Sequence, residues 1–285
     1  MRSHLKFQRY GMFLLAAVLS SCAANSSTNR GGMEQNTIRI KGSDTMLLLA
    51  RRWSEVYMAQ NPGVAIYVEG GGSATGLDAL ISGSVDIATT SRPLRPEESR
   101  SLAQKYGSLG VSTLCARDAL SIYLHPDNPI DDLDISQLRE IFTGRIRNWS
   151  ELGGPDLPIT VLSRNPSSGT FLFFLEHVLL NQEFGANVRY LPTTRAIATK
   201  VLEDPSAIGY GGMAYGREVK HAAVSGVQPT PENVRDGIYP VSRYLYLYTV
   251  RETRGLARQF IDWVLGAEGQ RLVEDVGYIP LFKTE

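Results

Sequence analysis

The sequence predicts an α/β protein built around a largely parallel sheet. From residue 37 onward, short β-branched runs such as TIRIKG and VAIYVE alternate with longer runs that carry apolar residues at helical spacing. Polar, glycine-rich loops separate the two kinds of run, and strands that alternate with helices are typical of a parallel sheet. With 285 residues, the chain is long enough for one large domain or for two lobes of ordinary size.

The first third of the chain repeats a strand–loop–helix pattern. In the first predicted helix, Leu49, Trp53, Val56 and Tyr57 follow the spacing of one buried face, and SDT supplies N-cap residues before it. The segments predicted in this part are a strand at 37–42, a helix at 46–60 ended by NPG, a strand at 64–69, a helix at 77–83, a strand at 85–91 and a helix start after SRPLRPEE.

The middle and end of the chain have the same character. The predicted segments are a strand at 119–125, a capped helix at 134–143 with Gly144 after its end, a strand at 159–165, a helix at 171–180, a strand at 239–250 and a helix at 256–277. The last helix is expected to break near Gly266. No repeat of 20 to 50 residues is present in the sequence.

The N-terminus is typical of a secretory leader. Arg2, Lys6 and Arg9 form a basic region, and GMFLLAAVLS forms an apolar core that is too short to span a bilayer stably. The full chain has 29 basic and 29 acidic residues; removing residues 1–21 takes away three basic and no acidic ones, which leaves 26 and 29. This balance argues against nucleic acid as a main partner.

The leader ends in LSSC, and this tetrapeptide resembles the bacterial lipobox. We therefore expect residues 1–21 to be a lipoprotein signal peptide and Cys22 to be lipidated, which would anchor the folded part to a bacterial membrane. The alternative is an ordinary signal peptide with an incidental cysteine. Residues 22–36 are polar and read as a flexible tether. Cys115, alone in the remaining chain, cannot form an intrachain disulfide there and is expected to be a packed core thiol.

Four loops at predicted strand ends are rich in hydroxyls and glycines: GSDTM, GGGSATG, TTSRP and SRNPSSGT. Ligands in α/β sheets bind at the carboxyl ends of strands, close to the unpaired N–H groups that begin a helix. Glycine lets the backbone approach an anion, and arginine can give it two parallel hydrogen bonds. Each loop alone could simply cap a helix, but four together, two of them with an arginine, predict a site for a small anion.

Six motifs occur in order between Ile38 and Leu281: IKGSDTM, VEGGGSATG, VDIATTSRPL, RNPSSGT, AIGYGGMAYG and GAEGQRLVEDVGYIPL. Through them the chain closely resembles the solute-binding proteins of bacterial phosphate ABC transporters. The resemblance implies a type II periplasmic-binding-protein fold, with two lobes that each contain a mixed, mostly parallel sheet flanked by helices. It implies a monomer facing the periplasm or cell exterior that captures phosphate in the interlobe cleft and delivers it to the permease subunits of an ABC importer, with no metal or organic cofactor.

The resemblance also implies the position of the lobes and of the site. The first lobe would comprise residues 37–117 and 246–285 and the second residues 118–245, with a hinge near 115–121 and 239–245. The phosphate-binding residues carried over by position are Thr45, Met46, Ser73, Ser91, Arg92, Arg164, Ser168, Gly169 and Thr170, and Ser43 and Asp44 join them from the first loop.

Two departures from the family pattern concern selectivity. Some members carry an aspartate in place of Ser91, which accepts a proton from phosphate, and another near the binding arginine, where this chain has Pro166. A buried carboxylate favours protonated phosphate over sulfate, and Asp44 is the nearest candidate acceptor here. A second branch of the family has the SRP form seen in this chain, so phosphate is the expected ligand. Sulfate, molybdate or another tetrahedral oxyanion is the alternative.

Two other classes of function are less well supported. A serine hydrolase needs a base near its nucleophile, but His177 would lie about 10 Å along the helix from Thr170, and His125 and His221 are expected at the surface. No metal-ligand spacing is present in the sequence. GYGGMA at 209–214 fits a dinucleotide-binding pattern by letter, but the PSAI run before it is too short to be the required strand.

Overall fold

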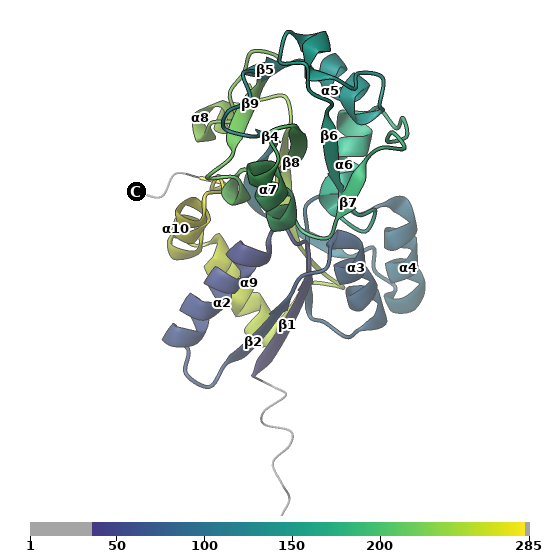
Figure 1. Ribbon diagram of the computed structural model, residues 1–285. Helices are drawn as coiled ribbons and strands as arrows, with labels where there is room; N and C mark the ends of the chain where they lie inside the picture. The colour runs from purple at the N-terminus through teal and green to yellow at the C-terminus, as the bar shows by residue number, and fades with distance from the viewer. Residues whose placement is uncertain (1–35, 283–285) are drawn as a thin grey trace, which may run out of the picture.

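The computed structural model describes residues 36–282 and consists of two lobes, one above the other in Figure 1. The lower, first lobe is formed by segments from both ends of the described chain, and the upper, second lobe is formed by its middle. The predicted two-lobed α/β architecture is therefore confirmed.

The first lobe has helices on both faces of its sheet (Figure 1). Its elements are β1 (Thr37–Gly42), α2 (Leu47–Gln60), β2 (Ala65–Glu69), α3 (Ser73–Ser82), β3 (Ile87–Thr90), α4 (Pro96–Tyr106), the first part of β4 (Val111–Leu124), β10 (Ser242–Thr249), α9 (Gly255–Leu265) and α10 (Ala267–Val276).

The second lobe holds the remaining elements. They are the last part of β4, β5 (Asp132–Leu133), α5 (Ile135–Phe142), the 3₁₀ helix η1 (Trp149–Leu152), β6 (Thr160–Arg164), α6 (Gly169–His177), β7 (Arg189–Leu191), α7 (Thr194–Glu203), β8 (Ala207–Gly212), η2 (Met213–Tyr215), β9 (Lys220–Val224) and α8 (Pro231–Arg235).

One strand, β4, links the sheets of the two lobes. The path of hydrogen-bonded strands is β2-β1-β3-β10-β4-β8-β6-β7. The pairs of β1 with β2 and β3, and of β6 with β7 and β8, are parallel, whereas β10 runs antiparallel to β3 and β4. The first part of β4 pairs with β10 up to Ala119, and residues 120–124 pair with β8. The chain therefore passes between the lobes without leaving the sheet.

Each lobe has its own hydrophobic core. In the first, Trp53, Phe260 and Val273 are fully buried, and in the second Phe142 and Phe174 are. Burial of a large apolar side chain stabilises a fold by roughly 1.5–3 kcal/mol, so each core can hold its own lobe together. Two residues pack into the core of the other lobe. Ala214, from the second lobe, packs into the first core, and Ile279, from the C-terminal segment of the first lobe, packs into the second core.

The predicted elements agree with the structure where the sequence pattern is long or is bounded by glycine or proline. The first helix, the first three strands and the helix break at Gly266 are confirmed. β4 begins at Val111, eight residues before the predicted strand. The short strands β7, β8 and β9 were not predicted individually, because three to six residues carry too little periodicity to define a strand. The ten-residue helix α7 was not predicted either.

Cys115 is a buried core residue, as expected. Its Sγ lies 3.3 Å from the carbonyl oxygen of Leu245, and burial raises the pKa of its thiol well above the usual range. The predicted leader, the lipidation site Cys22 and nearly all of the tether lie outside the described residues. Within residues 36–282, no helix has the length and apolar character needed to cross a bilayer.

Candidate functional site

The first hydroxyl-rich loop follows β1 and is buried. Ser43, Asp44 and Thr45 expose 2%, 6% and 1% of their surfaces. Helix α2 has Met46 as its N-cap, with no hydrogen bond from a side chain to the helix N-terminus. The predicted capping role of SDT is therefore wrong. Buried polar side chains that do not cap a helix need another partner, which favours a binding role for this loop.

The second and third loops meet through two serines. Ser73 is the first residue of α3, and Ser91 follows β3; both are fully buried. The Ser91 N–H donates to Ser73 Oγ at 3.2 Å, and the two Oγ atoms lie 3.5 Å apart. Gly72 serves as the N-cap of α3 with φ +107°, a conformation that favours glycine, so neither serine caps this helix.

The fourth loop brings the second lobe against these serines. Ser168 caps α6 by accepting from the N–H groups of Thr170 and Phe171 at 3.2 and 3.4 Å. A Cβ atom on Gly169 would lie 2.3 Å from Ser73 Oγ and 2.7 Å from Ser91 Oγ, so the backbone at this glycine faces both hydroxyls closely. Capping thus accounts for Ser168 but not for the hydroxyls of Ser73 and Ser91.

A hydroxyl pair and a backbone hydrogen bond join the two lobes directly. Thr45 Oγ1 lies 2.8 Å from Thr170 Oγ1, and the N–H of Ala74 donates to the carbonyl of Ser167 at 3.1 Å. We call Thr45, Ser73, Ser91, Gly169 and Thr170 the hydroxyl cluster. Its residues come from four loops that are up to 125 positions apart in sequence.

Arg164 stands at the end of β6 and supplies a buried positive charge, with only 1% of its surface exposed. Its Nη1 donates to Thr194 Oγ1 at 2.6 Å, and its Nη2 donates to the carbonyl of Pro192 at 2.9 Å. Asp44 Oδ2 lies 3.4 Å from Nη1. Burial lowers the pKa of Arg164, whereas the charge of Asp44 opposes this shift.

The guanidinium of Arg164 still has donors available. Arginine carries five N–H donors, and its Nε is buried without a hydrogen-bond partner among the described residues. Buried donors of this kind cost free energy unless a ligand or water satisfies them. Arg164 is therefore suited to bind an anion while remaining held in place by Thr194 and Pro192.

Arg92 has a different partner from the predicted anion. Its Nη1 and Nη2 form two hydrogen bonds with the carboxylate of Glu98, at 2.8 and 2.6 Å, and Nη1 also donates to the carbonyl of Pro93. The side chains of Arg92 and Glu98 are 3% and 8% exposed. This arginine mainly ties the third loop to the start of α4, and only its Nε lacks a hydrogen-bond partner within residues 36–282.

Arg92→Ala should destabilise the first lobe. The variant leaves the buried Glu98 carboxylate without its partner, and breaking a buried ion pair from one side costs about 3 kcal/mol. We expect urea unfolding to show this loss at neutral pH, and Arg258→Ala, from an exposed pair on α9, to change stability by less than about 0.5 kcal/mol. Equal losses of stability in Arg92→Ala and Arg258→Ala would contradict the structural role of the buried pair of Arg92 and Glu98.

The pH dependence follows from the pKa of Glu98. Burial opposes its ionisation, but hydrogen bonds and charge from Arg92 and Arg95 outweigh burial and lower the pKa. A carboxyl with a lowered pKa stabilises the fold above its unfolded pKa of about 4.3, and this contribution is lost as pH falls through the folded value. In Arg92→Ala, the free energy of unfolding should therefore fall less steeply as the pH is lowered through this range.

Sequence reasoning missed three polar residues next to the site. Thr194 begins α7, and its N–H donates to Asp44 Oδ2 at 2.9 Å. The Tyr215 hydroxyl donates to the carbonyl of Asp44 at 2.8 Å, and the Tyr278 hydroxyl donates to the carbonyl of Thr45. Helix α7 was detectable from the cap Thr193 and from the i, i+4 pair Ile197 and Val201. Nothing in the sequence around Tyr215 or Tyr278 indicates that these tyrosines contact the first loop.

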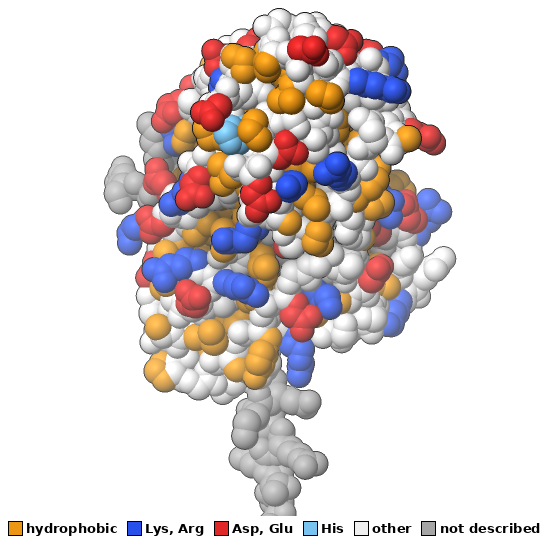
Figure 2. Space-filling view, viewed as in Figure 1, with side chains coloured by type: hydrophobic (Ala, Val, Ile, Leu, Met, Phe, Trp, Pro, Cys, Tyr) orange, Lys and Arg blue, Asp and Glu red, His pale blue; other side chains and the backbone are white. Residues whose placement is uncertain are grey.

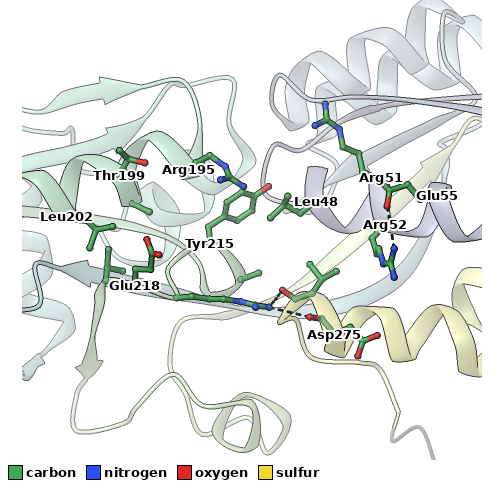
Figure 3. Close-up of a pocket in the computed structure, with 15 residues that line it drawn as sticks. Leu48, Arg51, Arg52, Glu55, Arg195, Thr199, Leu202, Tyr215, Glu218 and Asp275 are labelled. Atoms are coloured by element: carbon green, nitrogen blue, oxygen red, sulfur yellow. Dashed lines mark hydrogen bonds and ion pairs between the residues drawn. The ribbon is translucent and has the colours of Figure 1, made fainter.

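A groove of about 720 Å³ lies between α2 and α7, and no residue of the hydroxyl cluster lines it. In Figure 3, Arg195 and Tyr215 approach it from the second lobe and Leu48 from the first. Its lining contains four arginines and three acidic residues, and Figure 2 shows charges of both signs interspersed on this face of the molecule. Because these seven side chains are on exposed residues and water competes for them, the hydroxyl cluster is the better site for a small anion.

The hydrogen bonds of the described histidines are made outside the hydroxyl cluster. His177 Nδ1 lies 3.0 Å from the carbonyl of Phe173, and His221 Nε2 lies 2.5 Å from that of Gly216. His125 and His221 are partly buried, so the expectation that they lie at the surface is wrong. Within residues 36–282, no histidine hydrogen-bonds to the cluster, and no group of three or more His, Cys, Asp or Glu side chains could hold a metal ion.

The glycines of GYGGMA lie within a strand. β8 spans Ala207–Gly212 and is buried along its whole length, so all three glycines of the motif lie in a strand and not in a phosphate-binding turn. A side chain at Gly209 would collide with Ile197, and one at Gly211 would collide with Thr194 and Tyr123. Close packing explains these glycines.

Comparison with known proteins finds relatives over nearly the whole chain. A family model described as the PBP superfamily domain matches residues 24–268. The phosphate-binding protein PstS of Pseudomonas aeruginosa strain PAO1 is 31% identical over 300 residues, covering 97% of this chain and 93% of the relative. The phosphate-binding protein PstS of Bacillus subtilis strain 168 is 33% identical over 284 residues, covering 95% and 93%.

Solved structures of similar proteins share the fold over most of the chain. A Clostridium perfringens structure, named as a phosphate ABC transporter substrate-binding protein with bound phosphate, has a TM-score of 0.80 and 32% identity, covering 87% of this chain and 100% of that one. An ABC-type phosphate transport receptor from Vibrio cholerae has a TM-score of 0.71 and 26% identity, covering 85% and 99%.

Proposed function

Since the chain belongs to the PBP superfamily and, within it, to the family of the phosphate-binding proteins PstS, we propose that it captures inorganic phosphate between its lobes and delivers it to an ABC importer. One observation carries the proposal for this chain: buried hydroxyls and a buried arginine from both lobes converge on one place. Such a site can surround a small oxyanion with donors from two sides.

In the proposed complex, phosphate takes over the hydrogen bonds that the lobes now make to each other. The hydroxyls of Thr45 and Thr170 lie 2.8 Å apart, so one oxygen of an anion beside them would be within reach of both donors. Ser73 and Ser91 would bind from the first lobe. Helices α3 and α6 both begin at the hydroxyl cluster, so the positive ends of their dipoles would favour an anion there, and Arg164 supplies the charge.

We propose that the hinge lies where β4 and β10 pass between the lobes, with the lobe boundaries predicted from the sequence. Asp118 and Arg243 are directly paired across these strands, and Arg243 Nη2 donates to Asp118 Oδ2 at 2.8 Å. Both side chains are almost fully buried. A buried pair at this position would hold the two strands in register while the lobes open and close.

The proposal extends to location and partners. We propose that a lipid on Cys22 and the following tether hold a monomeric protein at a bacterial membrane, facing the periplasm or cell exterior, where it meets the permease subunits of the importer. We also propose that the protein binds phosphate without changing it chemically, since no histidine contacts the hydroxyl cluster within residues 36–282. Hydrolysis of a phosphate ester by the purified protein would contradict this.

Isothermal titration calorimetry with phosphate, sulfate and molybdate tests the function. We expect phosphate to bind with a Kd of about 1 µM or lower, because both lobes close on it with buried donors. Sulfate or molybdate binding more tightly than phosphate would favour the alternative that the chain serves another tetrahedral oxyanion. Binding of none of the three would contradict the proposed site.

A further inference from the structure

Two of the six sequence motifs contribute no residue to the proposed phosphate site. AIGYGGMAYG contains β8 and η2, and GAEGQRLVEDVGYIPL contains α10 and the segment that follows it. Each of these motifs nevertheless provides one tyrosine that reaches the loop after β1. The Tyr215 hydroxyl donates to the carbonyl of Asp44 at 2.8 Å, and the Tyr278 hydroxyl donates to the carbonyl of Thr45.

The two accepting carbonyls belong to the peptide groups on either side of Thr45. A peptide group is planar, so the orientations of these two groups set the φ and ψ angles of Thr45. Together with the χ1 rotamer, these angles determine where the Thr45 hydroxyl points. In this structure that hydroxyl lies 2.8 Å from Thr170 Oγ1 of the second lobe. The tyrosines therefore hold the backbone from which a proposed phosphate donor projects.

The loop has little support from the helix that it precedes. No side chain caps the N-terminus of α2, and the loop forms turn hydrogen bonds from Met46 N–H to the carbonyl of Ser43 at 3.0 Å and from Leu47 N–H to that of Asp44 at 3.2 Å. Thr45 is only 1% exposed. Loss of a tyrosine hydroxyl would therefore leave a buried carbonyl with one donor fewer, in a place where water does not readily replace it.

Both tyrosines are themselves held by packing near the boundary between the lobes. Tyr278 is 2% exposed and packs into the first core, whereas the next residue, Ile279, packs into the second core. The backbone of Ile279 also forms two hydrogen bonds with that of Arg117 in β4, at 2.8 and 3.0 Å. Tyr215 packs against the first core, and in Figure 3 its ring extends toward Leu48 of α2.

The tyrosine hydroxyls are suited to hold the loop and not to bind the anion themselves. Burial raises the pKa of both Tyr215 and Tyr278, so both remain protonated at neutral pH. A phenolic hydroxyl has a single proton to donate. In each tyrosine this proton is already directed to a carbonyl of the loop.

We propose that Tyr215 and Tyr278 are positioning residues of the phosphate site that act through the hydroxyl of Thr45. The inference rests on the proposed phosphate-binding function and deepens it. With both donors in place, the peptide groups beside Thr45 have one orientation before phosphate arrives. Without one of them the loop samples other orientations, and binding must then order it again, which lowers affinity.

Tyr278→Phe and Tyr215→Phe test the proposal because each removes a hydroxyl and keeps the ring. Calorimetric titration should show a phosphate Kd about tenfold higher in either variant than in wild type. Tyr106→Phe is the matched control, since the partly buried Tyr106 donates to the carbonyl of Ile81 at 3.0 Å, at the opposite end of α3 from the cluster. It should lower the unfolding midpoint about as much as Tyr215→Phe does, with phosphate affinity unchanged.

A double-mutant cycle separates positioning from a general loosening of the fold. Thr45→Val keeps the branched side chain but removes the hydroxyl through which the tyrosines are proposed to act. Tyr278→Phe should therefore raise the phosphate Kd about tenfold in wild type and less than twofold in the Thr45→Val background. An equal factor in both backgrounds would overturn the proposal, because the tyrosine would then affect binding by another route.

The outcomes distinguish this inference from the function on which it rests. Failure of the wild-type protein to bind phosphate would remove the proposed function and the inference with it. Phosphate binding by wild type with an unchanged Kd in either folded tyrosine variant would overturn the positioning role and leave the function intact. If Tyr278→Phe does not fold, Tyr215→Phe takes its place in the cycle with Thr45→Val and decides the proposal alone.

Discussion

Arg164→Ala should abolish tight phosphate binding. The variant removes the buried positive charge of the proposed site and leaves Asp44 unpaired next to it, so the cleft would change from neutral to negative. Loss of one member of a buried, hydrogen-bonded charge pair lowers affinity by about 100-fold or more, equivalent to roughly 3 kcal/mol. Calorimetric titration with phosphate measures the loss directly.

A second variant shows whether the loss comes from binding or from damage to the fold. Arg164→Ala combined with Asp44→Asn removes both charges, so we expect thermal stability to recover in part while phosphate affinity remains low. Arg145→Ala, from an exposed pair with Glu140, is the matched control and should bind as wild type does. Micromolar phosphate affinity in Arg164→Ala would refute the assignment of this residue.

The architecture could be predicted from the sequence because its signals are local. Strands bounded by glycine and proline, the helical face of Trp53 and Tyr57, and the break at Gly266 each depend on residues within one or two turns. The hydroxyl-rich loops were also visible, since each follows a strand directly. Their convergence was expected only from the general position of ligands at strand ends and from family resemblance.

The polar contacts around the site could not be predicted, because they join distant segments. Asp44 meets Thr194 across 150 positions, and the Tyr278 hydroxyl reaches Thr45 across 233. The direction of the Arg92 side chain was equally hidden, although Glu98 lies only six residues away. The capping box at the start of α4, in which Glu98 accepts the Arg95 N–H, was the available local signal that this carboxylate points back toward the loop.

The hydroxyl pairs also bear on how closure is coupled to binding. In this structure Thr45 of the first lobe contacts Thr170 of the second, and Gly169 faces Ser73 and Ser91 across the same boundary. A ligand bound to one lobe alone would receive hydrogen bonds only from the hydroxyls of that lobe. The closed conformation therefore binds the anion more tightly than an open one, and binding increases the fraction of molecules that are closed.

Gly169→Val should prevent this closure. A Cβ atom at position 169 would lie 2.3 Å from Ser73 Oγ and 2.7 Å from Ser91 Oγ, both closer than side-chain contacts allow, and 3.0 Å from Ser73 Cβ, which is a very tight contact. The serine hydroxyls could rotate away, but they are the proposed phosphate donors, and the Cβ atom of Ser73 cannot rotate. We expect phosphate affinity to fall roughly 10- to 100-fold, as overpacking of a tight interior does.

The position of the obstruction predicts a particular pattern of measurements. Because the two lobes have separate cores, the variant can relieve the collision by opening, so its unfolding midpoint without phosphate should stay close to that of wild type. Small-angle X-ray scattering should show wild type becoming more compact with phosphate and Gly169→Val remaining extended. Ala186→Val adds similar bulk to an exposed loop of the second lobe and should behave as wild type. Normal compaction and normal affinity in Gly169→Val would place the phosphate site elsewhere, since no closed cleft with this geometry could accept the added side chain.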